Sequence, residues 1–303
     1  MGTSISQNKK TRVRISSLAF FLVFAVTAVL LNISYDKSRF DKDSSNAPKL
    51  ALSNATVTLV RTEYSERQTL EIVDWIRSVQ HLSVNICVLV DAEEYGRWLS
   101  AGLKLALPAR LISRIRIINV EQEFTECDTT ELPTSPCKQN HAYRQSGYKR
   151  MCRLWYSAVW SYLTEYDFVL RFDLDNTYKK GAWPMHIAKF GTVKCESGDN
   201  PDVTNGLTET IWGREISRRR TEVYYPYTNV MFVNVQWILH EASLRNIFDT
   251  VEFSNCICIN RWGDLPLWGE TLGKLGVEIE VMRDWNYLHR SHGFEISGRD
   301  STC

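Results

Sequence analysis

A short apolar segment that ends in two acidic residues constrains the fold of this chain more than any other feature. The segment Phe168–Phe172, FVLRF, is too short for a stable helix and rich in strand formers, so it predicts a buried strand. Asp173 and Asp175 follow directly, separated by one leucine. Open α/β sheets bind ligands at the carboxyl ends of their strands, so we expect both carboxylates at a ligand site. Such oxygen ligands suit Mg²⁺ or Mn²⁺, the cations that accompany nucleotide diphosphates.

A lone D-x-D motif is nevertheless more often a solvated acidic turn, so the surrounding sequence must decide. Apolar periodicity before the motif predicts alternating strands and helices. The strands are expected at 57–60, 84–90 and 115–120, and the helices at 65–80, 93–105 and 148–163. This β-α-β-α-β-α-β order predicts a single α/β domain with a mostly parallel central sheet. No G-x-G-x-x-G or Walker loop follows a strand, which disfavours a Rossmann dehydrogenase or a P-loop enzyme.

The chain is less regular after the acidic motif. We expect a helix over 208–217, a strand over 229–235, a helix over 237–248, a helix that begins near Leu267 and a strand over 277–281.

The N-terminus predicts a membrane anchor. Residues 15–33 contain no charged side chain and are long enough to cross a hydrocarbon core of about 30 Å. Four Lys and Arg residues precede this run, so the short end is expected in the cytosol and the rest across the membrane. The predicted organisation is a cytosolic tail at 1–14, a transmembrane signal anchor at 15–33, a luminal stem at 34–55 and a catalytic domain at 56–303. A cleaved signal peptide is the alternative.

Composition argues against nucleic acid as a partner and indicates an oxidising compartment. The net charge of +1 gives no electrostatic reason to expect nucleic acid as a partner. Eight cysteines in an exported domain indicate disulfides, and we expect Cys127 to pair with Cys137 within one polar loop. Cys87 lies inside an apolar strand and is expected to be a buried thiol. The sequon at Asn54 predicts a glycosylation site near the end of the stem.

Several motifs together resemble the fungal α-1,2-mannosyltransferases of the yeast cell-wall and glycoprotein type. The chain has YKRMCR at 148–153, the strand and acidic motif at 168–175, RWGDLP at 261–266 and YLH at 287–289. That family has Y-x-x-M-C-R-F, W-R-V-E-P-D, E-R-W-G-D-A-P and G-Y-x-H in the same order. TLVRT at 58–62 is similar to the family's first strand and turn, and the resemblance includes the type II anchor.

The resemblance implies a GT-A-like fold, a Golgi membrane location with a luminal catalytic domain, GDP-mannose as donor, Mn²⁺ and a glycan or glycoprotein acceptor. Carried over by position, it makes Asp173 and Asp175 the candidate catalytic carboxylates, with Asp175 and His289 as metal ligands. It places Arg61, Tyr148 and Arg153 near the nucleotide. It places Trp262 and Asp264 on the acceptor side, with Trp262 stacking on a sugar. Without the resemblance, His289 is more often a packed or surface histidine, and His292 is a nearby alternative.

The chain departs from the family pattern at two positions. Its acidic motif is Asp-Leu-Asp instead of Glu-Pro-Asp, which shortens the first carboxylate. Met231 stands where the family has a glutamate that is a candidate for contact with the sugar.

Three other functions remain open from the sequence. D-x-D-x-T at 173–177 also resembles the first motif of aspartyl-phosphate hydrolases, in which the first aspartate is the nucleophile. That motif usually opens its domain, whereas several α/β elements precede it here. A membrane-anchored glycan-binding protein that keeps the fold without turnover is the second alternative, and a transferase of another nucleotide sugar is a third.

Overall fold

The computed structural model describes residues 54–124, 146–197, 206–213, 223–260, 262–291, 293–299 and 303. The predicted tail, the predicted anchor, most of the predicted stem, and Cys127, Cys137 and His292 lie outside these residues. Within the described part of the chain, no helix has both the length and the apolar character needed to cross a membrane. The first described strand begins at Asn54, so the folded domain already includes Asn54 and Ala55.

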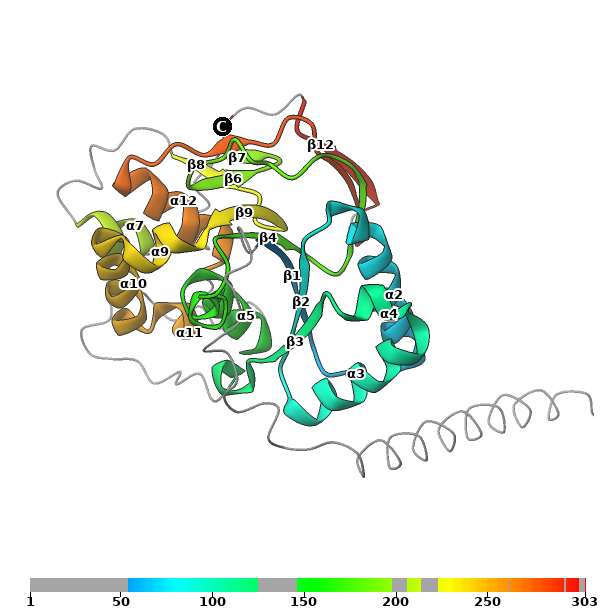
Figure 1. The fold of residues 1–303 in the computed structure, drawn as a ribbon. Coiled ribbons are helices and arrows are strands. Elements are labelled where there is room, and N and C mark those ends of the chain that lie inside the picture. Colours follow the sequence, from blue (N-terminus) through cyan, green and yellow to red (C-terminus); the bar gives the residue numbers. More distant parts are fainter. Residues whose placement is uncertain are drawn as a thin grey trace, which may run out of the picture.

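A seven-stranded sheet forms the centre of the molecule, in the order β10-β6-β9-β4-β1-β2-β3 (Figure 1). Strands β3, β2, β1 and β4 run parallel, and β9 inserts antiparallel between β4 and β6. Four of the six pairings are parallel, which confirms a mostly parallel α/β sheet. The strand bounds are β1 Asn54–Val60, β2 Asn85–Val90, β3 Ile115–Asn119, β4 Phe168–Phe172, β6 Phe190–Thr192, β9 Val230–Asn234 and β10 Glu280–Val281.

Helices cover both faces of this sheet, as Figure 1 shows, and this explains why its inner strands are apolar on both sides. On one face lie α2 Glu66–Val79, α3 Glu93–Ala106 and α4 Ala109–Ile112. On the other lie α5 Ser146–Tyr156, α7 Leu207–Trp212, α9 Val235–His240, α10 Ala242–Ser254, α11 Cys256–Ile259 and α12 Asp264–Leu275. The Ser65 hydroxyl accepts from the backbone N–H of Gln68 and so caps the start of α2, near the predicted boundary.

Four predicted helices have different bounds in the structure. The helix expected over 208–217 is α7, which already ends at Trp212. The helix expected over 148–163 ends at Tyr156 and gives way to a 3₁₀ turn, η4 Ala158–Tyr162. The helix expected over 237–248 is two helices, because Glu241 leaves the helical conformation and caps α10 with its carboxylate. The helix expected near Leu267 begins at Asp264, since Pro266 falls in the first turn, where its missing N–H costs nothing.

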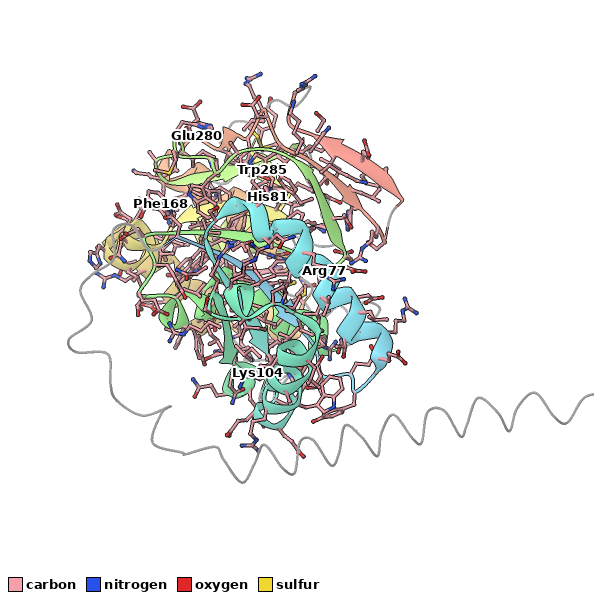
Figure 2. The ribbon with its side chains drawn as sticks, turned by 45° about the vertical axis from the view of Figure 1, so that its right-hand side comes forward. Arg77, His81, Lys104, Phe168, Glu280 and Trp285 are labelled. Atoms are coloured by element: carbon pink, nitrogen blue, oxygen red, sulfur yellow. A yellow bond between two sulfur atoms is a disulfide. The ribbon has the colours of Figure 1, made fainter. Side chains whose placement is uncertain are left out.

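A second, antiparallel sheet of three strands lies beside the carboxyl end of β4. It consists of β5 Asn176–Lys180, β11 Asn286–His289 and β12 Phe294–Ser297. Helix α2 and the turn η2 Gln80–Leu82 lie against this sheet, where His81 stacks on Tyr178 with ring centroids 4.2 Å apart. Tyr178 in turn contacts Trp285, and Figure 2 shows His81 and Trp285 close together at this junction. The second sheet is therefore packed against helix α2, which also covers one face of the first sheet.

Two short strands form a third sheet, which a disulfide links to the C-terminal residue. β7 Cys195–Ser197 pairs with β8 Tyr224–Pro226, and Cys195 is bonded to Cys303. Cys87 is a buried free thiol, as predicted, and Cys152 is another. Cys256 and Cys258 are both disulfide-bonded, a state that the sequence does not predict.

Candidate active site

The acidic motif forms a tight turn between the two sheets. β4 ends at Phe172, and the Asp173 backbone N–H donates to the Asn229 carbonyl at 3.0 Å. The Asn176 N–H then donates back to the Asp173 carbonyl at 3.0 Å, and β5 begins. The motif therefore lies at the carboxyl end of a central parallel strand, where the sequence predicts it.

The turn brings His289 to Asp175, although 114 residues separate them in sequence. β5 pairs with β11 in a register that sets Asn176 opposite His289, so the histidine ring lies beside the acidic turn. His289 Nε2 is 3.0 Å from Asp175 Oδ2. His289 is only 2% exposed, whereas the Asp175 side chain is 41% exposed. The predicted metal pair is thus adjacent, with its carboxylate facing solvent.

Three polar groups converge on the same nitrogen of His289. Besides Asp175 Oδ2, the Asn229 side-chain amide lies 3.1 Å and the Ser291 hydroxyl 3.0 Å from Nε2. One ring nitrogen makes a single hydrogen bond, so this convergence exceeds what the imidazole alone can satisfy. On the other side of the ring, the Tyr227 hydroxyl lies 3.1 Å from Nδ1 and fixes its orientation.

These residues fit a divalent cation with borderline character. A carboxylate oxygen, an imidazole nitrogen and a neighbouring amide or hydroxyl oxygen are donors that Mn²⁺ accepts, and an outer partner on the imidazole is usual at metal sites. Among the described residues, no group of three or more His, Cys, Asp and Glu side chains could hold a metal ion. A cation here would therefore take further ligands from its substrate, as cations bound to diphosphates do.

The first aspartate has different partners. Arg171, on the same strand, donates from Nε to Asp173 Oδ1 at 2.8 Å and from an Nη to Asp173 Oδ2 at 3.1 Å. Its other Nη donates to Asp264 Oδ2 in the first turn of α12. The guanidinium also lies over the Trp155 ring, 4.4 Å from its centroid. Arg171 is 3% exposed and Asp264 is 6% exposed, so this ion-pair network is buried.

Burial and ion pairing act against each other in this network. Burial lowers the pKa of Arg171, but its ion pairs with Asp173 and Asp264 outweigh burial, so that pKa is raised. Burial raises the pKa of Asp173 to about 6, against the lowering effect of Arg171, and the nearby carboxylates Asp264 and Asp175 raise it further. Burial likewise raises the pKa of Tyr227 to about 12, so its hydroxyl stays protonated beside His289. The site contains more carboxylates than cationic side chains, which favours a bound cation.

The predicted nucleotide residues lie at the ends of β1 and of α5. Arg61 follows β1, and its Nε is 3.9 Å from Asp91 Oδ2 beyond β2. The Thr62 backbone N–H and hydroxyl both donate to Asp91. The Arg61 guanidinium packs against Gly147, where an added Cβ would lie 2.6 Å from it, so a larger residue at 147 would displace the guanidinium. The structure thereby sets Arg61 beside the residue that precedes Tyr148.

The other predicted site residues lie in three different places: Tyr148 near Asp264, Arg153 against α10, and Trp262 in the apolar core. A Cβ at Gly263 would lie 3.6 Å from the Tyr148 hydroxyl, so Tyr148 reaches the start of α12 next to Asp264. Arg153 forms an ion pair with Glu252 of α10 at 2.7 Å. Trp262 is 1% exposed and belongs to the apolar core, so its ring is not presented to an acceptor in this structure.

Met231 is completely buried in β9, opposite Arg171 in the neighbouring strand. The position where the resemblance expects a glutamate therefore supplies core packing and no carboxylate.

Sequence reasoning did not find Arg171, Tyr227, Asn229 and Ser291. A charged residue inside the otherwise apolar FVLRF strand is the one available signal for Arg171, because a buried charge requires a partner. Tyr227 and Asn229 are 62 and 60 residues from His289 in sequence, and Ser291 follows it by two residues without forming a recognisable motif.

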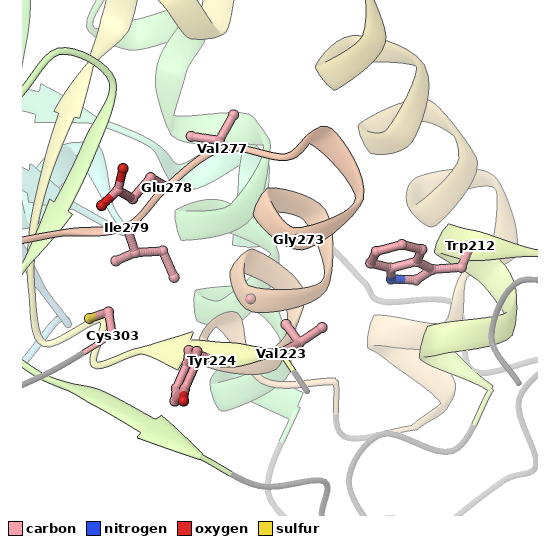
Figure 3. Close-up of a pocket in the computed structure, with 9 residues that line it drawn as sticks. Trp212, Val223, Tyr224, Gly273, Val277, Glu278, Ile279 and Cys303 are labelled. Atoms are coloured by element: carbon pink, nitrogen blue, oxygen red, sulfur yellow. The ribbon is translucent and has the colours of Figure 1, made fainter. Parts of the chain in front are cut away.

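A separate cavity of about 240 Å³ lies at the carboxyl end of α12 (Figure 3). It is lined by Trp212, Tyr224, Gly273, Glu278, Ile279 and Cys303, and by none of the predicted site residues. Asp264 is at the opposite end of the same helix, so this cavity is distinct from the acidic turn.

Comparison with known proteins finds similarity in structure only. No family model matches the sequence, and no curated protein matches it. The mannosyltransferase Ktr4p from S. cerevisiae, in complex with GDP, has 16% identity and a TM-score of 0.53, covering 79% of this chain and 71% of that one. Core-mannan synthase A (CmsA/Ktr4) from Aspergillus fumigatus, in an Mn/GDP form, has 13% identity and a TM-score of 0.56, covering 82% and 78%. At these identities the likeness shows a shared fold, which confirms the fold expected from the resemblance.

Proposed function

We propose that this chain is a type II Golgi-membrane glycosyltransferase that moves mannose from GDP-mannose to a hydroxyl of a glycan or glycoprotein acceptor with the help of Mn²⁺. The observation that carries the proposal is the meeting of Asp175 with His289 at the carboxyl end of β4, in a fold shared with mannosyltransferases bound to GDP and Mn/GDP. The resemblance contributes the α-1,2 linkage, the retained configuration and the membrane topology to this proposal.

The roles of the side chains follow from their geometry. Asp175 and His289 would hold the cation, with Tyr227 keeping the imidazole in place through Nδ1 so that Nε2 faces Asp175. Bound Mn²⁺ would neutralise the diphosphate and stabilise it as a leaving group. Arg61, exposed beside the first turn of α5, is available for a charge-assisted contact with the nucleotide.

The acceptor side is expected around the start of α12. Asp264 and the Tyr148 hydroxyl lie together there, linked to the acidic turn through Arg171. Their polar atoms can accept from or donate to sugar hydroxyls.

The hydrolase alternative requires a free nucleophile at Asp173. Both Asp173 oxygens instead accept hydrogen bonds from Arg171, which makes this carboxylate a poor nucleophile. The binding-protein alternative is supported by Met231, because that position offers no carboxylate to the sugar.

The test is calorimetric titration of the purified chain with GDP, with and without Mn²⁺. We expect Mn²⁺-dependent GDP binding, which Asp175→Asn and His289→Ala each weaken by roughly 10-fold or more, on the order of 1.4 kcal/mol. Asp249→Asn and His240→Ala are matched controls at exposed positions on α10 and α9, and both should bind like wild type.

Three outcomes separate the alternatives. A wild-type protein that binds no GDP in either condition contradicts the proposed function. GDP binding without transfer of mannose to any mannoside favours another donor, another acceptor or the binding protein. Steady release of phosphate from a phosphomonoester, lost in Asp173→Asn, would establish the hydrolase.

A further inference from the structure

Arg171 is a buried charge in a strand that is otherwise apolar. Its side chain is 3% exposed, between Leu170 and Phe172, which are both completely buried. A buried guanidinium is tolerated only where its charge and its N–H groups are matched by partners. Both of its partner carboxylates belong to the candidate active site.

The contacts of Arg171 divide between two elements. The planar guanidinium meets both oxygens of Asp173 in the two-pronged geometry that suits arginine and carboxylate. It holds Asp264 at the start of α12 at the same time, and it stacks on Trp155 from α5. One side chain thus ties the end of β4 to two helices of the covering layer.

Asp175 is in a contrasting position two residues later. Its carboxylate is 41% exposed and faces His289 Nε2, while the Asp173 carboxylate is 24% exposed and has both oxygens on Arg171. Two aspartates separated by one residue therefore face different groups. Because the affinity of a cation site rises with the number of charged ligands, this difference has a consequence for metal binding.

We propose that Arg171 is a positioning residue that binds the Asp173 carboxylate and keeps it from ligating the cation, so that the cation takes Asp175 and His289 but not Asp173. The same contact fixes Asp264 beside Asp173 at the start of α12. With one carboxylate instead of two, the site holds Mn²⁺ weakly alone and firmly only with the diphosphate. The identity of the cation and of the diphosphate rests on the proposed function, while the positioning by Arg171 does not.

The experiment measures Mn²⁺ binding without nucleotide, by electron paramagnetic resonance of the free ion, on the full chain. In Arg171→Met the Asp173 carboxylate is released, and we expect Mn²⁺ to bind about 3- to 10-fold more tightly than in wild type. Arg171→Lys, which keeps one point contact, should lie between the two. The double variant Arg171→Met with Asp173→Asn should lose the gain. A purely structural role for Arg171 predicts weaker binding in every variant.

The result that overturns the proposal is equal Mn²⁺ affinity in Arg171→Met and in the double variant, with native circular dichroism in both. If Arg171→Met does not fold, Asp173→Asn decides the question. We expect it to change the Mn²⁺-dependent affinity for GDP less than about 2-fold, against 10-fold or more for Asp175→Asn. Equal losses in these two variants would also overturn it.

A failure of the proposed function has a different signature. In that case wild type binds no Mn²⁺ with GDP. The thermal unfolding of the metal-free protein still reports on the ion pairs of Arg171 with Asp173 and Asp264. Arg171→Met alone should lower the melting temperature, because it leaves the buried Asp264 and the half-buried Asp173 without their cationic partner, and the further changes Asp173→Asn and Asp264→Asn should raise it again. Absence of this recovery would refute the positioning role independently of the metal.

Discussion

Trp75 of α2 contacts the residue before the acidic turn, from the face of the sheet opposite to α5 and α12. Its replacement by phenylalanine tests whether this contact stabilises the turn. Its indole Nε1 donates to the carbonyl of Phe172 at 3.0 Å, the last residue before Asp173. Trp75 is 1% exposed, so neither group can find water instead. Trp75→Phe keeps an aromatic ring but removes the donor.

The expected loss can be worked from these contacts. A buried carbonyl that loses its partner costs about 1–3 kcal/mol, and the space left by the smaller ring adds about 1 kcal/mol. The sum is about 2–4 kcal/mol. For a domain of this size, each kcal/mol corresponds to about 2–4 °C, so the melting temperature should fall by about 4–16 °C. Because the freed carbonyl adjoins Asp173, the Mn²⁺-dependent affinity for GDP should fall as well.

Trp237 provides the matched control. Its Nε1 is buried without a hydrogen-bond partner, so Trp237→Phe makes the same chemical change but removes an unsatisfied donor. We expect its melting temperature to stay within about 4 °C of wild type, because the relief of that donor offsets the lost packing. Thermal unfolding followed by circular dichroism avoids the change in tryptophan fluorescence. Equal shifts in the two variants would refute the role given to the Trp75 hydrogen bond.

Three further outcomes are expected. Glu270 is fully buried and accepts hydrogen bonds from Trp212 Nε1 at 2.7 Å and the Tyr225 hydroxyl at 2.9 Å. Urea unfolding should therefore show Glu270→Leu to be less stable than wild type by about 3–5 kcal/mol, and Glu270→Gln by less. Cys303→Ser opens a disulfide that spans 108 residues, and the entropy of that loop predicts a loss of about 4–5 kcal/mol, which a reducing agent should reproduce in wild type but not in the variant. In intact microsomes the C-terminal domain should be protected from protease, and a cytosol-accessible C-terminus would contradict the proposed topology.

Much of the fold could be predicted because its signals are local. The strand Phe168–Phe172 has the predicted bounds. The helices after β1 and β2 differ from their predicted bounds by no more than one residue at either end. Short buried strands between amphipathic helices leave little doubt about an α/β sheet. The break at Glu241 was not predictable in this way, since the apolar spacing continues across it and only the capping contact with the Ser243 N–H reveals two helices.

The positions of the two carboxylates could be predicted from the sequence, but the groups that surround them could not. The position of Asp173 and Asp175 follows from the end of a strand, but the environment of each depends on residues far away in sequence. His289 reaches Asp175 through the pairing of β5 with β11, and Asp264 reaches Arg171 across 93 residues. Pairing and packing of this range leave no periodic trace in the sequence, so only the resemblance pointed to His289.

The charge balance around Arg171 explains how the fold accommodates Met231. The two residues face each other across β4 and β9, so side chains at these positions lie on the same face of the sheet. A glutamate at 231 would lie beside the guanidinium and compete with its present partners. Here Asp173 and Asp264 already satisfy Arg171, so residue 231 can be apolar without leaving a buried charge unpaired. Residue 231 therefore offers no carboxylate to a donor sugar, and Asp173 and Asp264 are both held by Arg171.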